Sequence, residues 1–466
     1  MASETSNSEF DVIVIGAGIN GAGIARDAAM RGLRVLLLDK GDVGGGTSSW
    51  STRLIHGGLR YLEHGELGLV RESLRERACL MNIAPHLVRP LRIMVPIYKH
   101  AQRGAWTIRA GMIAYDLLSF GKSLPPHQML SVSETLRQAS GLNPEELLGA
   151  ALYFDAQVEF AERLVLENVL SAIERGATVI THARVDKLQV KAGKVCAVEY
   201  TRVQSPKSKV QSHKFEIEPE VSRGEEGGHA PALASSPREA ATAPIVINAA
   251  GPWIDQVLGM NAPDSARLIG GTKGSHLIVA PFAGAPETAI YVEAETDRRP
   301  FFIIPWNGNY LIGTTDIRYD GDLDHVRIEA EETEYLLRET NRVIPEAQLT
   351  GAQILYAYSG VRPLPFVNEK EEQSITRRHF IRASPNIENL FSLVGGKLTT
   401  YRSLAEETVD LIFKRLGRST PTCTTGQVAL PGATVQRVEA GLAELSQRTN
   451  DRLARIYGTR SSAVKS

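Results

Sequence analysis

Cysteine is scarce in this sequence, and its scarcity excludes several kinds of site. The 466 residues contain three cysteines (Cys79, Cys196 and Cys423), and none of them forms a CxxC pair with another. Disulfide-built folds need more cysteines than this, and zinc and iron–sulfur centres usually show closely spaced pairs. We therefore expect no disulfide framework and no metal centre, and the thiols fit a reducing compartment.

A strong charge of one sign and long apolar runs are also lacking. The formal net charge is −1, so no overall field attracts nucleic acid, and we expect no nucleic-acid partner. No apolar run approaches the roughly 20 residues that span a bilayer. The first residues, MASETSNSEF, are polar and acidic and do not resemble a signal peptide. We expect a cytoplasmic protein, peripheral on the cytoplasmic membrane and not crossing it.

The remaining composition is that of a soluble globular protein, with 43% hydrophobic and 23% charged residues. A chain of this length should bury a large core and form two domains, with a small third element. Residues 203–242 are dominated by Ser, Pro, Glu, Lys, Gly and Ala. Such a segment cannot bury enough apolar surface to offset the entropy lost on ordering, and we predict a mobile insertion.

The clearest motif is a glycine turn between a continuous apolar run and a helix rich in small residues, over 19–31. Gly16, Gly18 and Gly21 have the GxGxxG spacing, which lets the backbone approach a pyrophosphate at a helix N-terminus. Asp39 ends the next strand, where a carboxylate binds the hydroxyls of an adenosine ribose. These features predict a βαβ unit that binds an unphosphorylated dinucleotide.

Two later glycine turns favour FAD over NAD. A strand ends in Ala249–Gly251, and GGKLTT (395–400) precedes a helix near the C-terminal end. A cofactor long enough to reach these segments and the first turn is FAD. Thr399 or Thr400 as an N-cap would direct a helix N-terminus at the flavin pyrimidine edge, whose reduced form carries negative charge.

Seven segments resemble the FAD-dependent sn-glycerol-3-phosphate dehydrogenases, within the glycine-oxidase-like flavoproteins. They are, in chain order, IGAGINGAGIARDAAMRGL, TSSWSTRLIHGGLRYLEHGE, INAAGPW, KGSHLIV, IPWNGNYLIGTTD, YSGVRPL and GGKLTTYRSLAE, across nearly all of residues 10–405. SSWSTRLIHGGLRYLE and GGKLTTYR are highly specific, whereas the dinucleotide fingerprint alone is not. The resemblance implies an α/β fold, with a Rossmann-type FAD-binding domain and a substrate domain built on a mixed, largely antiparallel sheet.

The resemblance also implies a domain division. The FAD-binding domain is expected to be discontinuous, over 10–85, 150–200, 243–260 and 355–415. The substrate domain would comprise 86–149 and 261–354, and residues 416–466 would form a short helical tail. Respiratory members of the family usually carry a longer helical C-terminal region, so we expect membrane docking and any homodimer to differ from theirs.

The family transfers a hydride from C2 of glycerol 3-phosphate to flavin N5, which yields dihydroxyacetone phosphate, and its respiratory members pass the electrons to quinone. By resemblance, Arg362 and His56 lie beside the reacting carbinol. One would stabilise charge on the oxygen, and the other would accept the proton, for which imidazole is the better group because it titrates near working pH.

A phosphate dianion needs several cationic donors, and the residues expected to bind the substrate are Arg60, Tyr61, Lys273, His276 and Lys397. The residues expected to contact the cofactor are Gly16, Gly18, Asn20, Gly21, Asp39, Thr47, Ser48, Ser51, Leu54, His56, Gly57, Val185, Ala250, Gly251, Asp316, Gly396, Lys397, Leu398 and Thr399. Several have a structural interpretation as well: His56 as a turn cap, Arg60 in a surface ion pair, Tyr61 in the core. His64 is expected to be structural or solvent-facing.

Three other functions stay open. An oxidase of the same family would pass electrons to oxygen, and an amine or 2-hydroxyacid flavoenzyme would bind a carboxylate. A single arginine suffices for a carboxylate, so the surplus of cations argues against the second. A non-catalytic FAD-binding or RNA-modification protein is the third, and the near-neutral charge argues weakly against RNA.

Two segments bear on membrane binding. Residues 66–84 are predicted to form an amphipathic helix. Residues 86–122 mix apolar side chains with several cations and a single acid, Asp116. This second segment is interpreted as helical, either lying in a bilayer interface or packed with solvated flanks.

Overall fold

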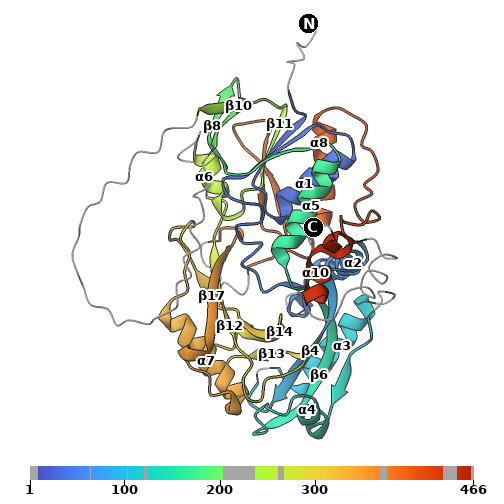
Figure 1. The fold of residues 1–466 in the computed structure, drawn as a ribbon, viewed down its shortest axis with the longest axis vertical. Helices are drawn as coiled ribbons and strands as arrows, with labels where there is room; N and C mark the ends of the chain where they lie inside the picture. Colours follow the sequence, from blue (N-terminus) through green and yellow to red (C-terminus); the bar gives the residue numbers. More distant parts are fainter. Residues whose placement is uncertain are drawn as a thin grey trace, which may run out of the picture.

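The computed structural model describes residues 9–62, 65–101, 103–119, 121, 124–202, 237–260, 267–367, 375–433 and 449–462. Their strands form three sheets, which we name A, B and C. In Figure 1, sheet A and its helices occupy the upper part of the molecule, and sheet B occupies the lower part.

Sheet A has six strands in the order β18-β19-β11-β1-β2-β7, and its neighbours are parallel except for the edge pair β18–β19. Its strands are β1 (Val12–Ile15), β2 (Val35–Leu38), β7 (Thr178–Ile180), β11 (Ile245–Asn248), β18 (Phe380–Ala383) and β19 (Leu390–Val394). One face is covered by α1 (Ile19–Met30), α5 (Ala161–Glu174) and α8 (Tyr401–Arg415). The other face carries α6 (Ile254–Gly259) and sheet C, made of β8 (Ala183–Lys191), β9 (Lys194–Arg202) and β10 (Arg238–Ala241).

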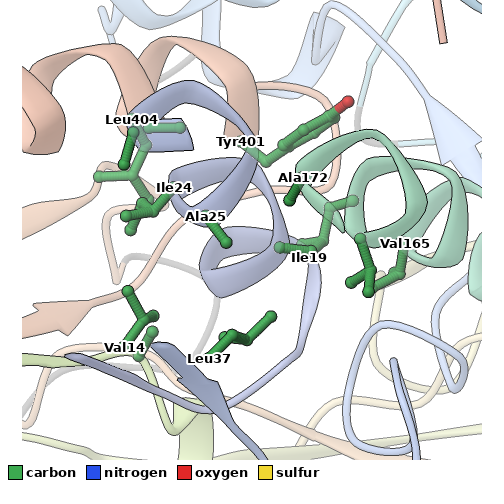
Figure 2. Close-up of a cluster of buried hydrophobic side chains, with 14 of the residues drawn as sticks. Val14, Ile19, Ile24, Ala25, Leu37, Val165, Ala172, Tyr401 and Leu404 are labelled. Atoms are coloured by element: carbon green, nitrogen blue, oxygen red, sulfur yellow. The ribbon is translucent and has the colours of Figure 1, made fainter. Parts of the chain in front are cut away.

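The apolar run of β1 is continuous because both faces of sheet A are buried. Val12 and Val14 pack against the helices, whereas Ile13 and Ile15 pack against sheet C. Figure 2 shows the helical side, where Val14 and Leu37 point toward α1. Since alternate side chains of a strand point to opposite faces, burial of both faces requires an apolar residue at every position. The predicted βαβ unit is confirmed.

Sheet B has ten strands in the order β16-β12-β15-β14-β13-β4-β6-β3, with β17 beside β12 and β5 beside β6. Its strands are β3 (Leu54–Ile55), β4 (Val88–Tyr98), β5 (Gln128–Leu130), β6 (Leu147–Val158), β12 (Thr272–Val279), β13 (Ala289–Glu293), β14 (Pro300–Trp306), β15 (Asn309–Gly313), β16 (Ile317–Arg318) and β17 (Ile354–Arg362). The pairs are antiparallel except β4–β13. Helices α4 (Val132–Gln138) and α7 (Ala330–Val343) pack on one face, and α2 (Leu67–Ile83) and α3 (Ala105–Ser119) on the other. The expected α/β fold, with a parallel and a mixed sheet, is confirmed.

The sheets depart from the predicted domain division at three strands. β3, β6 and β17 fall within ranges that the prediction gives to the FAD-binding domain, yet all three pair inside sheet B. The long antiparallel partners of β6 and β17, which are β4 and β12, decide this placement. The chain therefore leaves and re-enters sheet A more often than the motif order indicates.

Two local predictions are corrected, and a third, the helix over 66–84, agrees with the structure within one residue at each end. Residues 238–241, predicted to be mobile, form β10 on the edge of sheet C, and residues 203–236 lie outside the described residues. The expected helical segment 86–122 contains strand β4 before α3, because its apolar run is buried beside β6. A short apolar run does not by itself distinguish a strand from a helix. The helix predicted over 66–84 is α2.

The C-terminal region is helical only in part. Residues 417–433 form turns and extended chain, and α10 (Thr449–Tyr457) is followed by the 3₁₀ helix η6 (Gly458–Ser462). Residues 434–448 lie outside the described residues. Within the part of the chain that the structure describes, no helix combines the length and the apolar character needed to cross a bilayer.

Candidate active site between sheets A and B

A cavity of about 310 Å³ lies where loops from the carboxyl end of sheet A meet sheet B. Its walls come from the chain after β2, from β12 and β17, and from the loop before α8. This cavity is lined by most of the residues expected to bind the substrate or the reacting part of the cofactor: Thr47, Ser51, Leu54, His56, Arg60, Tyr61, His276, Asp316, Arg362, Gly396, Lys397, Leu398 and Thr399. Segments that are hundreds of residues apart in the sequence thus share one chamber.

The glycine turn after β1 is packed against backbone too closely for larger residues. Gly16 has a φ of +106°, and a Cβ there would lie 2.6 Å from the carbonyl oxygen of Ala249. A Cβ on Gly21 would lie 1.9 Å from the carbonyl oxygen of Gly16. Asp39 lies beside this turn and accepts hydrogen bonds from the Ala17 and Gly41 backbone N–H groups, at 2.5 and 2.8 Å. Burial raises the pKa of Asp39, and these two hydrogen bonds oppose the shift.

Other predicted cofactor residues surround the same turn. Ser48 Oγ accepts a hydrogen bond from the Ile19 N–H at 3.0 Å, at the start of α1 after Gly18. Asn20 faces Gly395 and Gly396, and its Oδ1 is buried without a protein partner among the described residues. Ala250 and Gly251 follow β11 and lead into the 3₁₀ helix η2 (Gly251–Trp253).

Three of the residues predicted to contact the cofactor, two with hydroxyl groups and one apolar, make contacts within the protein. Thr47 Oγ1 donates to the Val361 carbonyl at 2.6 Å, which ties the loop to β17. Ser51 Oγ donates to the Ser48 carbonyl at 3.2 Å. Val185 is buried in β8, where its side chain packs in the core between sheets A and C. Only the backbone of Val185 is left for a cofactor contact.

The backbone at His56 and Gly57 is held from two directions. The His56 N–H donates to Thr399 Oγ1 at 3.2 Å, and that hydroxyl donates to the His56 carbonyl at 3.3 Å. The Gly57 N–H donates to Asp155 Oδ1 at 3.1 Å. Helix α8 begins only at Tyr401, with Thr400 at the N-cap and no side-chain cap hydrogen bond. Thr399 therefore joins the two halves of the site rather than capping the helix.

Asp155 is the centre of a buried network that sequence reasoning missed. Its Oδ1 also accepts hydrogen bonds from Tyr115 Oη at 2.7 Å and from the Arg77 guanidinium. Arg77 comes from α2, Tyr115 from α3 and Asp155 from β6, and all three side chains are buried. No spacing pattern connects four such segments, so the sequence contains no local signal for this network.

Arg377, which the sequence analysis did not identify, forms a pair with Arg362. Arg362 and Arg377 both pair with Asp316, at 3.0 and 3.3 Å, and Arg362 also donates to Thr314 Oγ1 at 2.9 Å. Burial alone would raise the pKa of Asp316, but the charges of Arg362 and Arg377, together with contributions from Thr272 and Arg299, hold that pKa below its usual value. Asp316 thus positions both arginines at the cavity wall.

Lys397 and His56 lie in a poorly solvated part of the cavity. Lys397 Nζ donates to Ser73 Oγ at 2.8 Å and lies 4.1 Å from the centre of the Tyr61 ring. Burial lowers the pKa of Lys397 to about 7. Burial, with a contribution from the Lys397 charge, lowers the pKa of His56 to about 4. His56 is therefore neutral near pH 7 and a weaker base than an ordinary histidine.

His276 is brought into the site, whereas Lys273 is not. His276 is buried, its Nε2 lies 2.9 Å from Thr52 Oγ1, and burial lowers its pKa well below the usual value. Lys273 donates to Glu329 and Glu332 at 2.9 Å each, on the side of α7. Both residues belong to β12, but alternate side chains of a strand point to opposite faces. The predicted substrate contact of Lys273 is corrected for this reason. His64 lies outside the described residues.

Comparison with known proteins agrees with this geometry. A family model described as FAD dependent oxidoreductase (DAO) matches residues 11–411. The chain belongs to this family. The glycerol-3-phosphate dehydrogenase of Synechocystis sp. is 48% identical over 439 residues, which cover 92% of this chain and 74% of the relative. The aerobic glycerol-3-phosphate dehydrogenase of Escherichia coli is 37% identical over 466 residues, covering 97% and 84%.

Solved structures share the fold of this chain. The glycerol-3-phosphate dehydrogenase from Bacillus halodurans complexed with FAD superposes with a TM-score of 0.74 at 28% identity, over 99% of this chain and 78% of that one. The FAD-bound L-alpha-glycerophosphate oxidase from Mycoplasma pneumoniae has a TM-score of 0.61 at 16% identity, which shows a common fold.

The residues present fit the cofactor of this FAD-dependent family. The tight turn at Gly16 and Gly21 leads into the N-terminus of α1, the arrangement that binds a pyrophosphate, and the buried Oδ1 of Asn20 is a polar atom that a ligand can satisfy. The loop at 396–399 lines the cavity beside His56, where a flavin ring would meet the substrate.

The Asp155 network yields a stability prediction. Replacing Asp155 with Asn should lower the free energy of unfolding by about 3–5 kcal/mol, because the buried Arg77 charge loses its partner. The double variant Arg77→Met/Asp155→Asn should recover part of that loss, since no unpaired charge remains. Urea unfolding of the FAD-loaded variants measures both, and equal losses in the single and double variants would contradict the coupling.

Proposed function

We propose that this FAD-dependent oxidoreductase oxidises sn-glycerol 3-phosphate to dihydroxyacetone phosphate. The observation that carries the proposal is the group of cationic side chains on the cavity wall: Arg60, Arg362, Arg377 and Lys397. A phosphate dianion uses several such donors, whereas a carboxylate is satisfied by one arginine. The names of the relatives are consistent with this substrate.

In the proposed reaction, C2 of the substrate loses a hydride and its hydroxyl loses a proton. FAD, when bound, supplies the hydride acceptor. Arg362 is positioned by Asp316 and Thr314 to stabilise negative charge developing on the carbinol oxygen. His56 would accept the proton as the neutral imidazole beside the carbinol; burial lowers its pKa to about 4, which makes it a weaker base than the sequence analysis expected. Lys397 and Arg377 would hold the phosphate.

Anaerobic titration tests the substrate class. The purified, FAD-loaded protein should lose its visible flavin absorbance on addition of glycerol 3-phosphate, because hydride transfer reduces the flavin. Glycerol tests the need for the phosphate, and glycine and lactate test the amine and 2-hydroxyacid alternatives; none of the three should bleach the spectrum. Bleaching by glycine or lactate, but not by glycerol 3-phosphate, would overturn the proposal.

The low pKa of Lys397 predicts a pH dependence of substrate binding. Below about pH 7 the ammonium is charged; as the pH rises through that value it loses its proton, and its attraction for the phosphate is lost. The KM for glycerol 3-phosphate should therefore rise on the alkaline side, while Lys397→Arg, which stays charged, should flatten this rise. Steady-state kinetics from about pH 6 to 9 give the comparison, and identical profiles would refute the assignment.

We further propose that the protein binds a membrane surface through α3 and passes its electrons to quinone. Trp106, Leu117 and Ile113 are 81%, 71% and 47% exposed and lie on one face of this helix. Arg109 lies on the same face, with its guanidinium 5.9 Å from the Trp106 ring. A helix that exposes large apolar side chains next to a cation suits an anionic bilayer interface. The homodimer expected from the resemblance stays a prediction.

Vesicle binding tests this surface. Trp106→Ser/Leu117→Ser should reduce co-sedimentation with vesicles containing anionic lipid about tenfold or more, because the two large apolar side chains that would insert into the bilayer are removed. Leu355→Ser is the matched control, since Leu355 is 56% exposed but lies in β17, away from α3 (Figure 1). Equal binding by the wild type and the double variant would contradict the role of α3.

A further inference from the structure

A buried carboxylate, Glu332 of α7, lies behind Arg362 on the far side of strand β12. We propose that Glu332 is a positioning residue, which fixes the direction of the Arg362 guanidinium through Thr315; this inference rests on the proposed function, in which Arg362 stabilises the carbinol oxygen. Glu332 is 3% exposed and does not line the candidate active site. Any effect of Glu332 on the reaction must therefore pass through other residues.

Strand β12 separates the arginine from the carboxylate. A Cβ on Gly274 would lie 2.1 Å from Arg362 Nη2, so the guanidinium packs directly on the cavity face of this strand. The neighbours of Gly274 point to the opposite face, since side chains alternate along a strand. There Lys273 pairs with Glu332 at 2.9 Å, and Ser275 Oγ donates to Glu332 Oε1 at 2.7 Å. Arg362 and Glu332 thus lie on opposite sides of one strand.

Thr315 connects the carboxylate to the arginine. Its hydroxyl donates to Glu332 Oε1 at 2.6 Å, and its carbonyl oxygen accepts a hydrogen bond from Arg362 Nη2 at 3.3 Å. The residues on either side of it, Thr314 and Asp316, accept from the same guanidinium at 2.9 and 3.0 Å. Anchoring Thr315 therefore sets three of the acceptors around Arg362.

The network also reaches the strand that carries Arg362. Ser275 Oγ lies 2.7 Å from Ser359 Oγ in β17, the strand that ends at Arg362. Since the Ser275 hydroxyl donates its proton to Glu332, the Ser359 hydroxyl donates to Ser275. Glu332 thus holds β12, β17 and residues 314–316, the three pieces of backbone that meet at the guanidinium.

An apolar residue in place of Glu332 could hold the fold but not these directions. Exchange of a buried ion pair for apolar side chains of similar volume is often neutral or stabilising, because ions lose their hydration on burial. An ionised carboxylate, however, only accepts hydrogen bonds, so Lys273, Ser275 and Thr315 must all direct their donors toward it. The charge therefore serves the geometry of the site rather than its stability.

Thr315→Val tests this connection, because valine resembles threonine in shape but has no hydroxyl to donate to Glu332. Its rate constant for flavin reduction at saturating glycerol 3-phosphate should fall about tenfold or more, since a displacement of ~1 Å can cost about 10²-fold. Anaerobic stopped-flow measurement on the FAD-loaded enzyme gives this rate constant. The half-saturating substrate concentration should change little, because Arg362 acts on charge that develops in the transition state. Thr315→Ser keeps the hydroxyl and should return the rate to near that of the wild type.

Glu332→Gln should also slow flavin reduction, because the single amide oxygen cannot accept from all three donors. Glu339→Gln is the matched control. Glu339 lies on the same helix, is 2% exposed and accepts hydrogen bonds from Thr296 and Arg342, and it does not line the cavity. This variant should lose stability but reduce its flavin at the wild-type rate.

A double-variant comparison shows whether the effect passes through Arg362. Arg362→Lys should slow flavin reduction by itself, and the addition of Thr315→Val should slow it no further, because the guanidinium that Thr315 positions is already absent. Losses that add in the double variant would overturn the proposal.

The other outcomes are separable. Failure of glycerol 3-phosphate to reduce the wild-type flavin would overturn the proposed function itself. Normal reduction by the wild type, with an unchanged rate in Thr315→Val or an equal loss in Thr315→Ser or Glu339→Gln, would overturn the role of Glu332 alone. If Glu332→Gln does not load FAD, Thr315→Val and Thr315→Ser provide the same test.

Discussion

The candidate active site depends on how the backbone at His56 and Gly57 is held. The Thr399 hydroxyl contacts it from the loop before α8, and the Asp155 carboxylate contacts it from β6. One contact belongs to the side of sheet A and the other to sheet B, so the position of His56 depends on the docking of the two sheets. Asp155 can hold the Gly57 N–H as a buried carboxylate because Arg77 balances its charge. An unpaired carboxylate in the same place would destabilise the fold.

Burial then sets the electrostatics of the cavity. It lowers the pKa of Lys397 to about 7 and of His56 to about 4, so the interior disfavours added positive charge. Asp316 offsets the repulsion between Arg362 and Arg377 but has a single negative charge for the two of them. A bound dianion would supply the missing negative charge, and this is the physical reason why a phosphate ester suits the site better than a monoanionic carboxylate.

Strand β12 shows what a family motif can identify in a site and what requires the tertiary structure. The segment KGSHLIV resembles a substrate-binding motif, and both Lys273 and His276 are credible ligands within it. Only His276 faces the cavity, because the two positions are an odd number of residues apart and alternate residues point to opposite faces. A resemblance identifies the strand, but the tertiary partner α7 decides which side chain is already engaged.

By itself, the sequence determined the features that are encoded locally. The βαβ unit with its glycine turn, Asp39, the helix α2 and the family-specific stretches are all contained in short windows, where spacing carries the information. The tertiary structure alone decided the pairing of β4 with β6, the Asp155 network, the place of Arg377 and the contacts of Glu332. These features join residues tens to hundreds of positions apart, and such contacts leave no periodic pattern in a single chain.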